Sequence, residues 1–263
     1  MTAKVFELGP AMPKKIVILG GTTEARKLAN LLVDTYGKTL CVVTSLAGRT
    51  ANPRLPKSSI REGGFSGVDG LITYLRNVKP DLLIDATHPY AAEISAHAVE
   101  ATHATDTPHI MLSRPPWQKE DNDRWVHVSD INEAVHEISR RSDACLVTTG
   151  INDIAEFTPI ITTKLFVRLI EPPKKPLPIQ EAKIIIGTPP YKKDDEIALY
   201  RLLGIDLMVS KNAGGDGTVA KIQAARALGI EVIMIDRPAM PECVTVSSIE
   251  DAFKHTQKTL SLS

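Results

Sequence analysis

The residues best suited to chemistry begin with two glycines and two threonines that follow an apolar run at residues 15–19. Gly20 and Gly21 let the backbone approach a pyrophosphate, and the helix predicted after them offers unpaired N–H groups to its oxygens. Thr22 and Thr23 add hydroxyl donors. We therefore predict a site for dinucleotide phosphates. Because Gly-Gly-Thr-Thr departs from G-x-G-x-x-G, a tight turn without a ligand is the alternative.

Ser45 and Arg49 follow the next apolar run, where a dinucleotide-binding fold meets the adenosine ribose. An NAD site usually places Asp or Glu there, because a carboxylate accepts from the ribose hydroxyls. Serine and arginine suit a 2′-phosphate instead, so we predict NADPH as the cofactor and keep NADH as the alternative. Further along, Gly63 and Gly64 either let the backbone pass close to a ligand or form a plain turn.

A third polar segment, Asp-Ala-Thr-His-Pro-Tyr at residues 85–90, follows a buried strand. The carboxyl ends of parallel strands are where ligands of open α/β sheets bind. His88 is therefore a candidate to donate a proton or to hydrogen-bond a cofactor, with helix capping as the alternative. The other histidines show no paired metal-ligand spacing, and we predict no metal site.

A second glycine loop lies at residues 209–219, between a predicted strand and a predicted helix. It repeats the anion-binding arrangement of the first loop, with Lys211 and Asn212 before the glycines and Thr218 near the helix start. Upstream, residues 161–193 carry seven basic and two acidic side chains. This segment either binds an acidic substrate or is a solvated lysine-rich loop.

Apolar runs and helix-period segments alternate along the chain, which indicates parallel sheets covered by helices. We predict strands at residues 15–20, 40–44, 81–86, 108–112, 144–148, 164–170, 182–186, 206–210 and 231–235. We predict helices at residues 23–35, 67–78, 91–103, 130–141, 194–203 and 218–228. The sequence thus favours an α/β fold with two Rossmann-like lobes, each a parallel sheet flanked by helices.

An internal repeat places the boundary between the lobes. Residues 109–115 resemble residues 231–238, and residues 125–134 line up with residues 243–252. Each half therefore ends in a strand, an Arg-Pro loop, a short strand and a helix, and chance similarity of such elements is the alternative. We predict an N-terminal nucleotide-binding lobe at residues 14–120 and a C-terminal lobe at residues 121–263 that completes an active-site cleft.

The 263-residue chain is long enough to bury a core in each lobe, and its 31 basic and 31 acidic side chains balance. Balanced charge removes the global reason to expect nucleic acid or an anionic membrane as a partner. No apolar run reaches the roughly 20 residues of a membrane span, and we expect a cytoplasmic monomer or weak homo-oligomer. The three widely spaced cysteines suit reduced, packed positions.

Taken together, the motifs resemble the precorrin-6A reductase family of corrin biosynthesis. The resemblance rests on residues 20–26, 45–49, 63–65, 85–90, 114–115, 211–215 and 237–238, in this order. It implies a pyridine-nucleotide-dependent reductase that reduces one double bond of an acidic tetrapyrrole. The substrate would be precorrin-6A or its cobalt form, and the product precorrin-6B or its cobalt form, in cobalamin biosynthesis. It also implies cofactor and macrocycle in a cleft between two α/β lobes.

The resemblance assigns roles to individual residues. His88 and Lys211 would be catalytic, although the proton could also come from water or from the substrate. The cofactor would contact Gly20, Gly21, Thr22, Thr23, Ser45, Arg49, Gly64, Thr87 and Tyr90. The substrate would contact Arg114, Arg168, Asn212, Gly214, Gly215, Thr218 and Arg237. The arginines in this set are our hypothesis for the carboxylate partners.

Two segments depart from the family pattern. Gly-Ile-Asn at residues 150–152 stands where Gly-Arg is expected, and Gly-Thr-Pro-Pro-Tyr at residues 187–191 stands where Arg-Gly-Pro-Phe/Tyr is expected. Two candidate carboxylate-binding arginines are therefore absent, which bears on the substrate contacts and on which corrinoid is used. Residues 1–13 form an extension to which the resemblance assigns no role.

Other functions fit the chain less well. A short-chain dehydrogenase or sugar epimerase relies on Tyr-x-x-x-Lys, and none of the five tyrosines has a lysine four residues later. A non-catalytic dinucleotide-binding sensor would share the first glycine turn but would not need the second loop at residues 211–218. A reductase of another acidic substrate stays open as an alternative.

Overall fold

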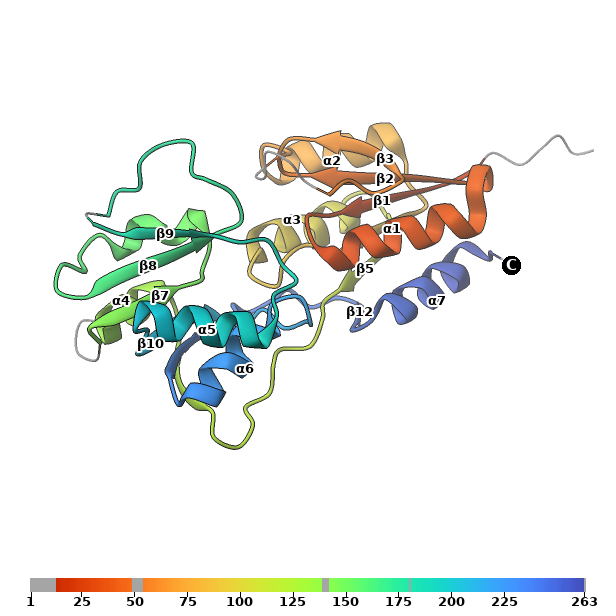
Figure 1. The fold of residues 1–263 in the computed structure, drawn as a ribbon. Coiled ribbons are helices and arrows are strands. Elements are labelled where there is room, and N and C mark those ends of the chain that lie inside the picture. The colour runs from red at the N-terminus through yellow and green to blue at the C-terminus, as the bar shows by residue number, and fades with distance from the viewer. Residues whose placement is uncertain (1–12, 49–53, 139–141, 180, 263) are drawn as a thin grey trace, which may run out of the picture. The chain divides into compact units, whose positions relative to one another are not determined.

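The chain folds into two compact units in a computed structural model (Figure 1). The structure describes residues 13–48, 54–138, 142–179 and 181–262. The first unit consists of Met1–Arg114 and Ala239–Ser263, and the second of Pro115–Pro238. Each unit contains one six-stranded sheet, and all described strand pairs are parallel.

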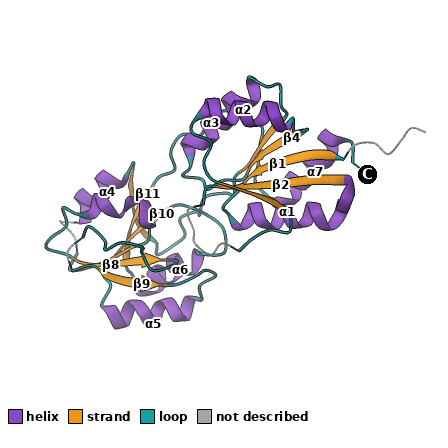
Figure 2. Cartoon of the chain, turned by 90° about the horizontal axis from the view of Figure 1, so that it is seen from above, coloured by secondary structure: helices purple, strands orange, loops and turns teal. Residues whose placement is uncertain are grey.

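The first unit has helices on both faces of its sheet (Figure 2). Its strands, in spatial order, are β12 (Thr245–Val246), β5 (His109–Leu112), β4 (Leu82–Asp85), β1 (Lys14–Leu19), β2 (Leu40–Leu46) and β3 (Ser59–Glu62). Its helices are α1 (Thr23–Tyr36), the 3-10 turn η1 (Gly37–Thr39), α2 (Val68–Val78), α3 (Ala92–His103) and α7 (Ile249–Leu260). This order, which reverses between β1 and β4, is that of the dinucleotide-binding Rossmann fold.

The core of the first unit follows from the alternation of side chains along β1. Ile16 and Ile18 pack in the cluster with α1 and α7, while Val17 and Leu19 pack in the cluster with α2 and α3. All four are at most 2% exposed, because a parallel strand covered on both faces has no solvent side. The same apolar run therefore fixes where Gly20 leaves the sheet.

The second unit repeats this architecture. Its strands, in spatial order, are β6 (Arg124–Val128), β11 (Glu231–Ile235), β10 (Leu207–Lys211), β7 (Ala144–Val147), β8 (Lys164–Leu169) and β9 (Lys183–Ile186). Its helices are α4 (Ile131–Ile138), the 3-10 helix η2 (Ile151–Phe157), α5 (Lys193–Leu203) and α6 (Val219–Leu228). Helix α5 packs beside α6, and α4 packs beside η2.

The two sheets have the same strand order, and each strand of one sheet has a counterpart in the other. Strands β1, β2 and β3 correspond to β7, β8 and β9, while β4 and β5 correspond to β10 and β11. The sixth strand is exchanged: β6 follows β5 in the chain but pairs with β11, and β12 follows β11 but pairs with β5. The repeat in the sequence is therefore a repeat of structure.

The structure corrects the predicted boundaries of 14–120 and 121–263. Residues 239–263 were assigned to the C-terminal lobe, but they belong to the first unit, because β12 pairs with β5 and α7 packs on α1. Tyr36 of α1 stacks on Phe253 of α7, with 5.9 Å between ring centroids. Residues 115–120 belong to the second unit. The repeat revealed both short strands but could not show which sheet each one joins.

Every predicted strand and helix is present, with ends within a few residues of those expected where the chain is described. Strand β3 was not predicted, since its residues 59–62 form a half-exposed edge with polar side chains rather than an apolar run. The short helix η2 was not predicted either. Single edge strands and short 3-10 helices depend on tertiary contacts more than on local pattern.

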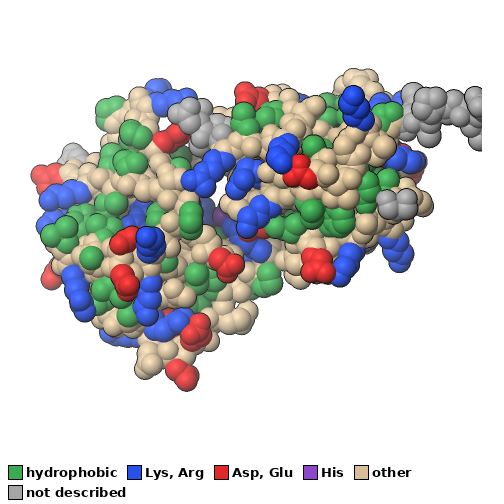
Figure 3. Space-filling model, turned by 45° about the vertical axis from the view of Figure 1, so that its right-hand side comes forward, with side chains coloured by type: hydrophobic (Ala, Val, Ile, Leu, Met, Phe, Trp, Pro, Cys, Tyr) green, Lys and Arg blue, Asp and Glu red, His purple; other side chains and the backbone are tan. Residues whose placement is uncertain are grey.

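Acidic and basic side chains are interspersed on the face shown in Figure 3, in keeping with the balanced charge. Within residues 13–48, 54–138, 142–179 and 181–262, the helices are all too short or too polar to cross a membrane. The same residues contain no group of three His, Cys, Asp or Glu side chains arranged to hold a metal ion. The cysteines are free thiols, and Cys145 is fully buried.

Candidate functional site

The glycine turn after β1 lies beside the end of β2, at the carboxyl edge of the first sheet. The Gly20 N–H donates to the Ser45 carbonyl across 2.9 Å. A Cβ at Gly20 would lie 2.8 Å from Cγ2 of Thr44, so this close approach requires glycine. Gly21 has a φ of +108°, and nothing lies within 4 Å of the position its Cβ would take. The turn therefore leaves open space beside Gly21.

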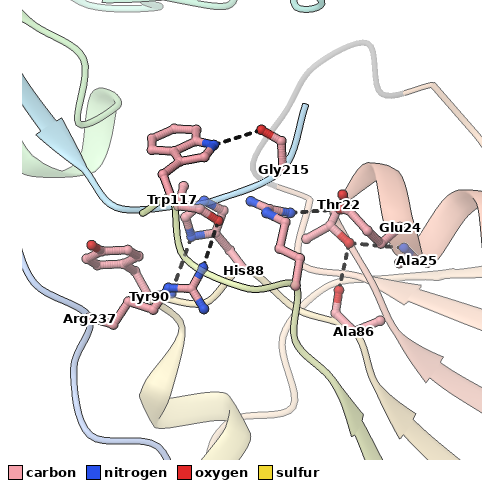
Figure 4. A network of polar contacts seen from close by, with 11 residues as sticks. Thr22, Glu24, Ala25, Ala86, His88, Tyr90, Trp117, Gly215 and Arg237 are labelled. Carbon is pink, nitrogen blue, oxygen red and sulfur yellow. Dashed lines mark hydrogen bonds and ion pairs between the residues drawn. The ribbon is translucent and has the colours of Figure 1, made fainter. Parts of the chain in front are cut away.

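Thr22 connects this turn to the end of β4. As the N-cap of α1, its hydroxyl accepts from the Ala25 N–H at 3.0 Å, and the same hydroxyl donates to the Ala86 carbonyl at 2.8 Å (Figure 4). Strand order reverses between β1 and β4, and ligands of open α/β sheets bind at such a reversal. Thr23 is the first residue of α1. The predicted phosphate residues thus lie where this fold binds nucleotides.

Glu24 places a carboxylate in the first turn of α1. It suits the helix dipole, but it would repel a phosphate bound at the same end. Nη1 of Arg114 donates to Oε2 of Glu24 across 2.7 Å, and both side chains are mostly buried. Arg114, predicted to bind the substrate, therefore pairs with an acid of its own unit and offsets its charge.

Arg61 on β3 holds the loop that contains Gly64. Nη1 donates to the Ser45 hydroxyl at 3.1 Å and to the Gly63 carbonyl at 2.6 Å, and Nη2 donates to the Gly64 carbonyl at 2.9 Å. The guanidinium also lies 3.8 Å from the centre of the Phe65 ring. Two predicted cofactor residues, Ser45 and Gly64, are thus brought together by a cation that was not predicted. Arg49 lies outside the described residues.

Asp85, buried at the end of β4, orders the polar segment that follows. Its Oδ1 accepts from the Thr87 N–H at 3.0 Å and from the Thr87 hydroxyl at 2.7 Å. The Nδ1 of His88 accepts from the Tyr90 N–H at 3.3 Å, with 5.7 Å between their rings. A neutral His88 that accepts at Nδ1 carries its proton on Nε2. Thr87, His88 and Tyr90 therefore share one ordered loop.

Lys211 ends β10 in the second unit. Its Nζ lies 2.6 Å from Oδ2 of Asp153 in η2, and each side chain is about one-fifth exposed. The lysine predicted to be catalytic is therefore one half of an ion pair. Its partner was not predicted, because η2 was not expected as a helix.

Asn212 holds Trp117, which lies in the segment that enters the second unit. Its Oδ1 accepts from the Trp117 N–H at 2.8 Å, and its Nδ2 donates to the Trp117 carbonyl at 3.1 Å. The indole N–H donates to the Gly215 carbonyl at 3.0 Å (Figure 4). Arg237 donates to the Asn212 and Ala213 carbonyls at 2.9 and 3.1 Å. Side chains and backbone of the glycine loop therefore fix the indole.

Gly214 passes against the same entering segment. A Cβ there would lie 2.0 Å from the Pro115 carbonyl oxygen, and its φ is +69°. The structure thus brings together four residues predicted to bind the substrate, Asn212, Gly214, Gly215 and Arg237. Thr218 precedes α6 as its N-cap but makes no side-chain capping bond.

Arg168 on β8 occupies a different environment from these four. Its Nη1 donates to Oε2 of Glu196 on α5, which also accepts from the Tyr200 hydroxyl at 2.8 Å. The Arg168 and Glu196 side chains are 6% and 5% exposed. Burial, followed by the charge of Glu196, raises the pKa of Tyr200. The predicted substrate arginine is therefore part of a buried ion pair.

Lys221 on α6 was also missed by the sequence reasoning. It is buried, and it donates to the Thr148 hydroxyl at 2.9 Å. The sequence of α6 carries a signal for this residue. The helix is apolar around most of its circumference, so Lys221 lies among buried neighbours. Trp117 carried no such signal, because it lies in a loop whose position depends on Asn212 and Gly215.

The fold and these contacts define a two-unit α/β protein with the Rossmann strand order in each sheet and a glycine turn at the strand reversal of the first sheet. The chain belongs to the family described as precorrin-6x reductase CbiJ/CobK, whose model matches residues 15–257. The family expected from the motifs is thereby confirmed.

Similar proteins match the chain over both units. A precorrin-6A reductase of a Sinorhizobium species is 39% identical over 252 residues, covering 96% of each chain. The solved structure of CobK precorrin-6A reductase is 37% identical, with a TM-score of 0.88 over 94% of this chain and 97% of that chain. A cobalt-precorrin-6A reductase of Priestia megaterium is 29% identical over 249 residues, covering 90% of this chain and 95% of the relative.

Proposed function

We propose that this chain is an NADPH-dependent precorrin-6A reductase that forms precorrin-6B in cobalamin biosynthesis. One observation carries the proposal: in a member of a reductase family, the glycine turn after β1 meets the end of β4 through the Thr22 to Ala86 hydrogen bond. That geometry suits a dinucleotide. The names of the relatives supply the substrate, an acidic tetrapyrrole.

The first unit fits the cofactor at the level of single residues. The open space beside Gly21 would admit a pyrophosphate, and the first turn of α1 presents N–H groups to it. Arg114 offsets the charge of Glu24 at this end of the helix. A bound NADPH would supply a hydride to one carbon of the substrate double bond, and a proton would reach the other carbon.

The end of β2 favours NADPH over NADH. Ser45 stands there in place of a ribose-binding acid, and the Arg61 guanidinium donates to its hydroxyl. A guanidinium beside a hydroxyl suits a 2′-phosphate, whereas a carboxylate at this position would repel it. Arg49 remains a proposed contact to the same phosphate.

His88 is our candidate for the group nearest the reacting atoms. Its neutral form carries the proton on Nε2, and the Tyr90 N–H fixes the ring through Nδ1. In this role His88 delivers a proton or orients the nicotinamide, while Thr87 and Tyr90 complete the loop. Replacing His88 with Ala tests whether the proton comes from His88 or from water or the substrate. A donor role predicts a large loss of kcat with NADPH binding intact.

The metal-free substrate is favoured over the cobalt form. The relative named for precorrin-6A shares more identity with this chain than the relative named for the cobalt form. The second unit would contact the acidic arms through the loop that begins at Lys211. In the free protein Asp153 holds the Lys211 ammonium, so a substrate carboxylate would compete with that acid.

The proposal is tested by mixing purified protein anaerobically with NADPH and either precorrin-6A or its cobalt form, following NADPH absorbance. Turnover of precorrin-6A with a two-hydrogen gain in product mass supports the reductase. Turnover of the cobalt form alone reassigns the substrate. Nucleotide binding without turnover of either compound favours a sensor or a reductase of another acidic substrate.

A further inference from the structure

Lys221 is a buried cation without an acidic ion-pair partner in the part of the chain that the structure describes. The residue is 6% exposed, its ammonium donates to the Thr148 hydroxyl, and the centre of the Trp117 ring lies 5.5 Å away. Lysine is almost never buried unless it is paired, because desolvating a charge is costly. A neutral hydroxyl and an aromatic ring only partly offset that cost.

The charges around Lys221 form a group that we call the second-unit cation cluster: Lys221, Arg168, Lys211, Glu196 and Asp153. Arg168 pairs with Glu196 and Lys211 with Asp153, so with Lys221 protonated three cations face two carboxylates and the cluster carries a net charge of +1. Burial lowers the pKa of Lys221 to about 7; Arg168 and Lys211 lower it as well, and Glu196 opposes them. A bound anion would restore the ammonium form.

The cluster lies at the strand reversal of the second sheet. Thr148 directly follows β7 and Lys211 ends β10, and the strand order reverses between these two strands. Next to Thr148, the Thr149 hydroxyl is buried, and within the described residues it has no hydrogen-bond partner. The Lys221 ammonium has three N–H donors and one hydrogen-bond acceptor among the described residues, the Thr148 hydroxyl, while the Thr149 hydroxyl has no partner there. Buried donors left without acceptors point to a ligand with negatively charged oxygen.

We propose that Lys221 binds one carboxylate arm of the substrate at this strand reversal, with Thr149 as a hydroxyl contact. The Thr148 hydroxyl, which donates to the Val209 carbonyl and accepts from Lys221, holds the ammonium in place. The inference rests on the proposed function and extends it to residues that the sequence reasoning did not select. One ammonium and one hydroxyl, both with donors to spare, match a single carboxylate, the group that an acidic tetrapyrrole offers. The first unit keeps the dinucleotide phosphates, so the two strand reversals take different anions.

Trp117 lines the proposed site, and its fluorescence can report the binding of a ligand. Hydrogen bonds to Asn212 and Gly215 fix its indole beside the Lys221 ammonium. A carboxylate bound to that ammonium changes the polarity at the indole and therefore its fluorescence. The only other tryptophan is Trp125 in β6, and a Trp125→Phe background leaves Trp117 as the single emitter.

The rival explanation is that Lys221 only ties α6 to Thr148. The two explanations predict opposite effects on stability. A charge kept for a ligand costs stability in the free protein, so Lys221→Met, apolar and of similar length, should hold or raise Tm. A purely structural hydrogen bond predicts a lower Tm and unchanged substrate binding.

The test compares wild type, Lys221→Met and Lys119→Met, the last being an exposed lysine of the same unit. We expect Lys221→Met to raise KM for precorrin-6A about ten- to hundredfold, the usual effect of losing a charge-assisted contact. KM for NADPH and kcat should stay near wild type, and Lys119→Met should match wild type throughout. A KM for precorrin-6A equal to that of wild type in Lys221→Met overturns the inference.

A second arm separates this inference from the proposed function. Propane-1,2,3-tricarboxylate is titrated against all three proteins in the Trp125→Phe background, with Trp117 fluorescence as the readout. A saturable response in wild type and Lys119→Met that is lost in Lys221→Met supports the site, even if no corrin precursor is reduced. An equal response in all three proteins, or none in any, overturns it.

Discussion

Arg114 and Glu24 lie 90 residues apart in the sequence and form an ion pair of 2.7 Å inside the first unit. The pair ties the end of the β5 segment to the first turn of α1. The pair also neutralises the Glu24 carboxylate at the helix end proposed to bind phosphate. We therefore propose that Arg114 supports the nucleotide site, while its contact with the substrate stays a prediction.

Replacing Arg114 with Ala should weaken NADPH binding about three- to tenfold, because the Glu24 charge would then face the phosphates. The double variant Arg114→Ala with Glu24→Gln should recover most of the loss. Arg76→Ala, at an exposed position of α2, serves as the control. Titration of NADPH by fluorescence measures all of these. A double variant as weak as the single one would contradict this role for the pair.

Gly21 and Gly64 offer a matched test of the glycine turn. Gly21→Ala puts a side chain at a φ of +108° and should cost about 1–2 kcal/mol of unfolding free energy. Its methyl would also enter the space proposed for the pyrophosphate, so NADPH affinity should fall sharply. Gly64→Ala meets nothing within 4 Å and has no positive φ, so its unfolding free energy should change little. Urea denaturation with and without NADPH compares the two variants, and equal losses would argue against a strained turn.

The Arg168 and Glu196 pair should govern stability rather than substrate affinity. Arg168→Met leaves the buried Glu196 carboxylate with a hydrogen bond from the Tyr200 hydroxyl but without its cation, and should cost about 3–5 kcal/mol. Arg168→Met with Glu196→Met removes both charges and should recover a large part of that loss. Thermal denaturation tests this order. If Arg168→Met kept its Tm but raised KM for the substrate, the original assignment of Arg168 to the substrate would stand.

The depressed pKa of Lys221 predicts a pH dependence of stability. The pKa is about 7 in the folded chain against an ordinary value of 10.5, so between these values the unfolded chain binds a proton that the folded chain has released. Stability attributable to Lys221 therefore rises as pH increases from about 7 toward 10.5, and its penalty is fully present below about pH 7.

Lys221→Met lacks this titration and supplies the reference. The stability advantage of Lys221→Met over wild type should be constant below about pH 7 and should shrink as the pH rises from about 7 to about 9. Arg168, Lys211 and Glu196 face the ammonium, and burial raises the pKa values of Tyr191 and Tyr200, which keeps both phenols protonated over this window. Urea denaturation of both proteins across the range gives the difference directly. A difference that stays constant with pH would contradict the depressed pKa.

Local pattern was sufficient to predict the parallel strands, since a buried parallel strand is an apolar run whatever its neighbours. The same pattern placed Gly20, Thr22 and His88 at carboxyl ends of strands, because those positions follow directly from where each strand stops. It did not predict β3, whose polar edge has no apolar run, and it did not show which sheet β12 joins. Both depend on partners distant in sequence.

The chemical partners of the candidate residues were harder to predict for the same reason. Nothing near Arg168 in the sequence shows that Glu196, on the next helix, occupies its guanidinium. Likewise Lys211 has its acid in η2, 58 residues earlier. The residue types predicted ligand contacts for Arg168 and Lys211. Whether each cation is available to a ligand depends on its ion pair with an acid that is distant in the sequence.

We propose that hydride passes from NADPH to the precorrin-6A macrocycle on this protein. The most direct measurement uses NADPH carrying deuterium at both C4 positions, incubated anaerobically with protein and precorrin-6A, with the product examined by mass spectrometry. We expect a product that gains one deuterium and one hydrogen, in step with NADPH oxidation. A product that gains two hydrogens and no deuterium, or no product while the nucleotide stays bound, would contradict it.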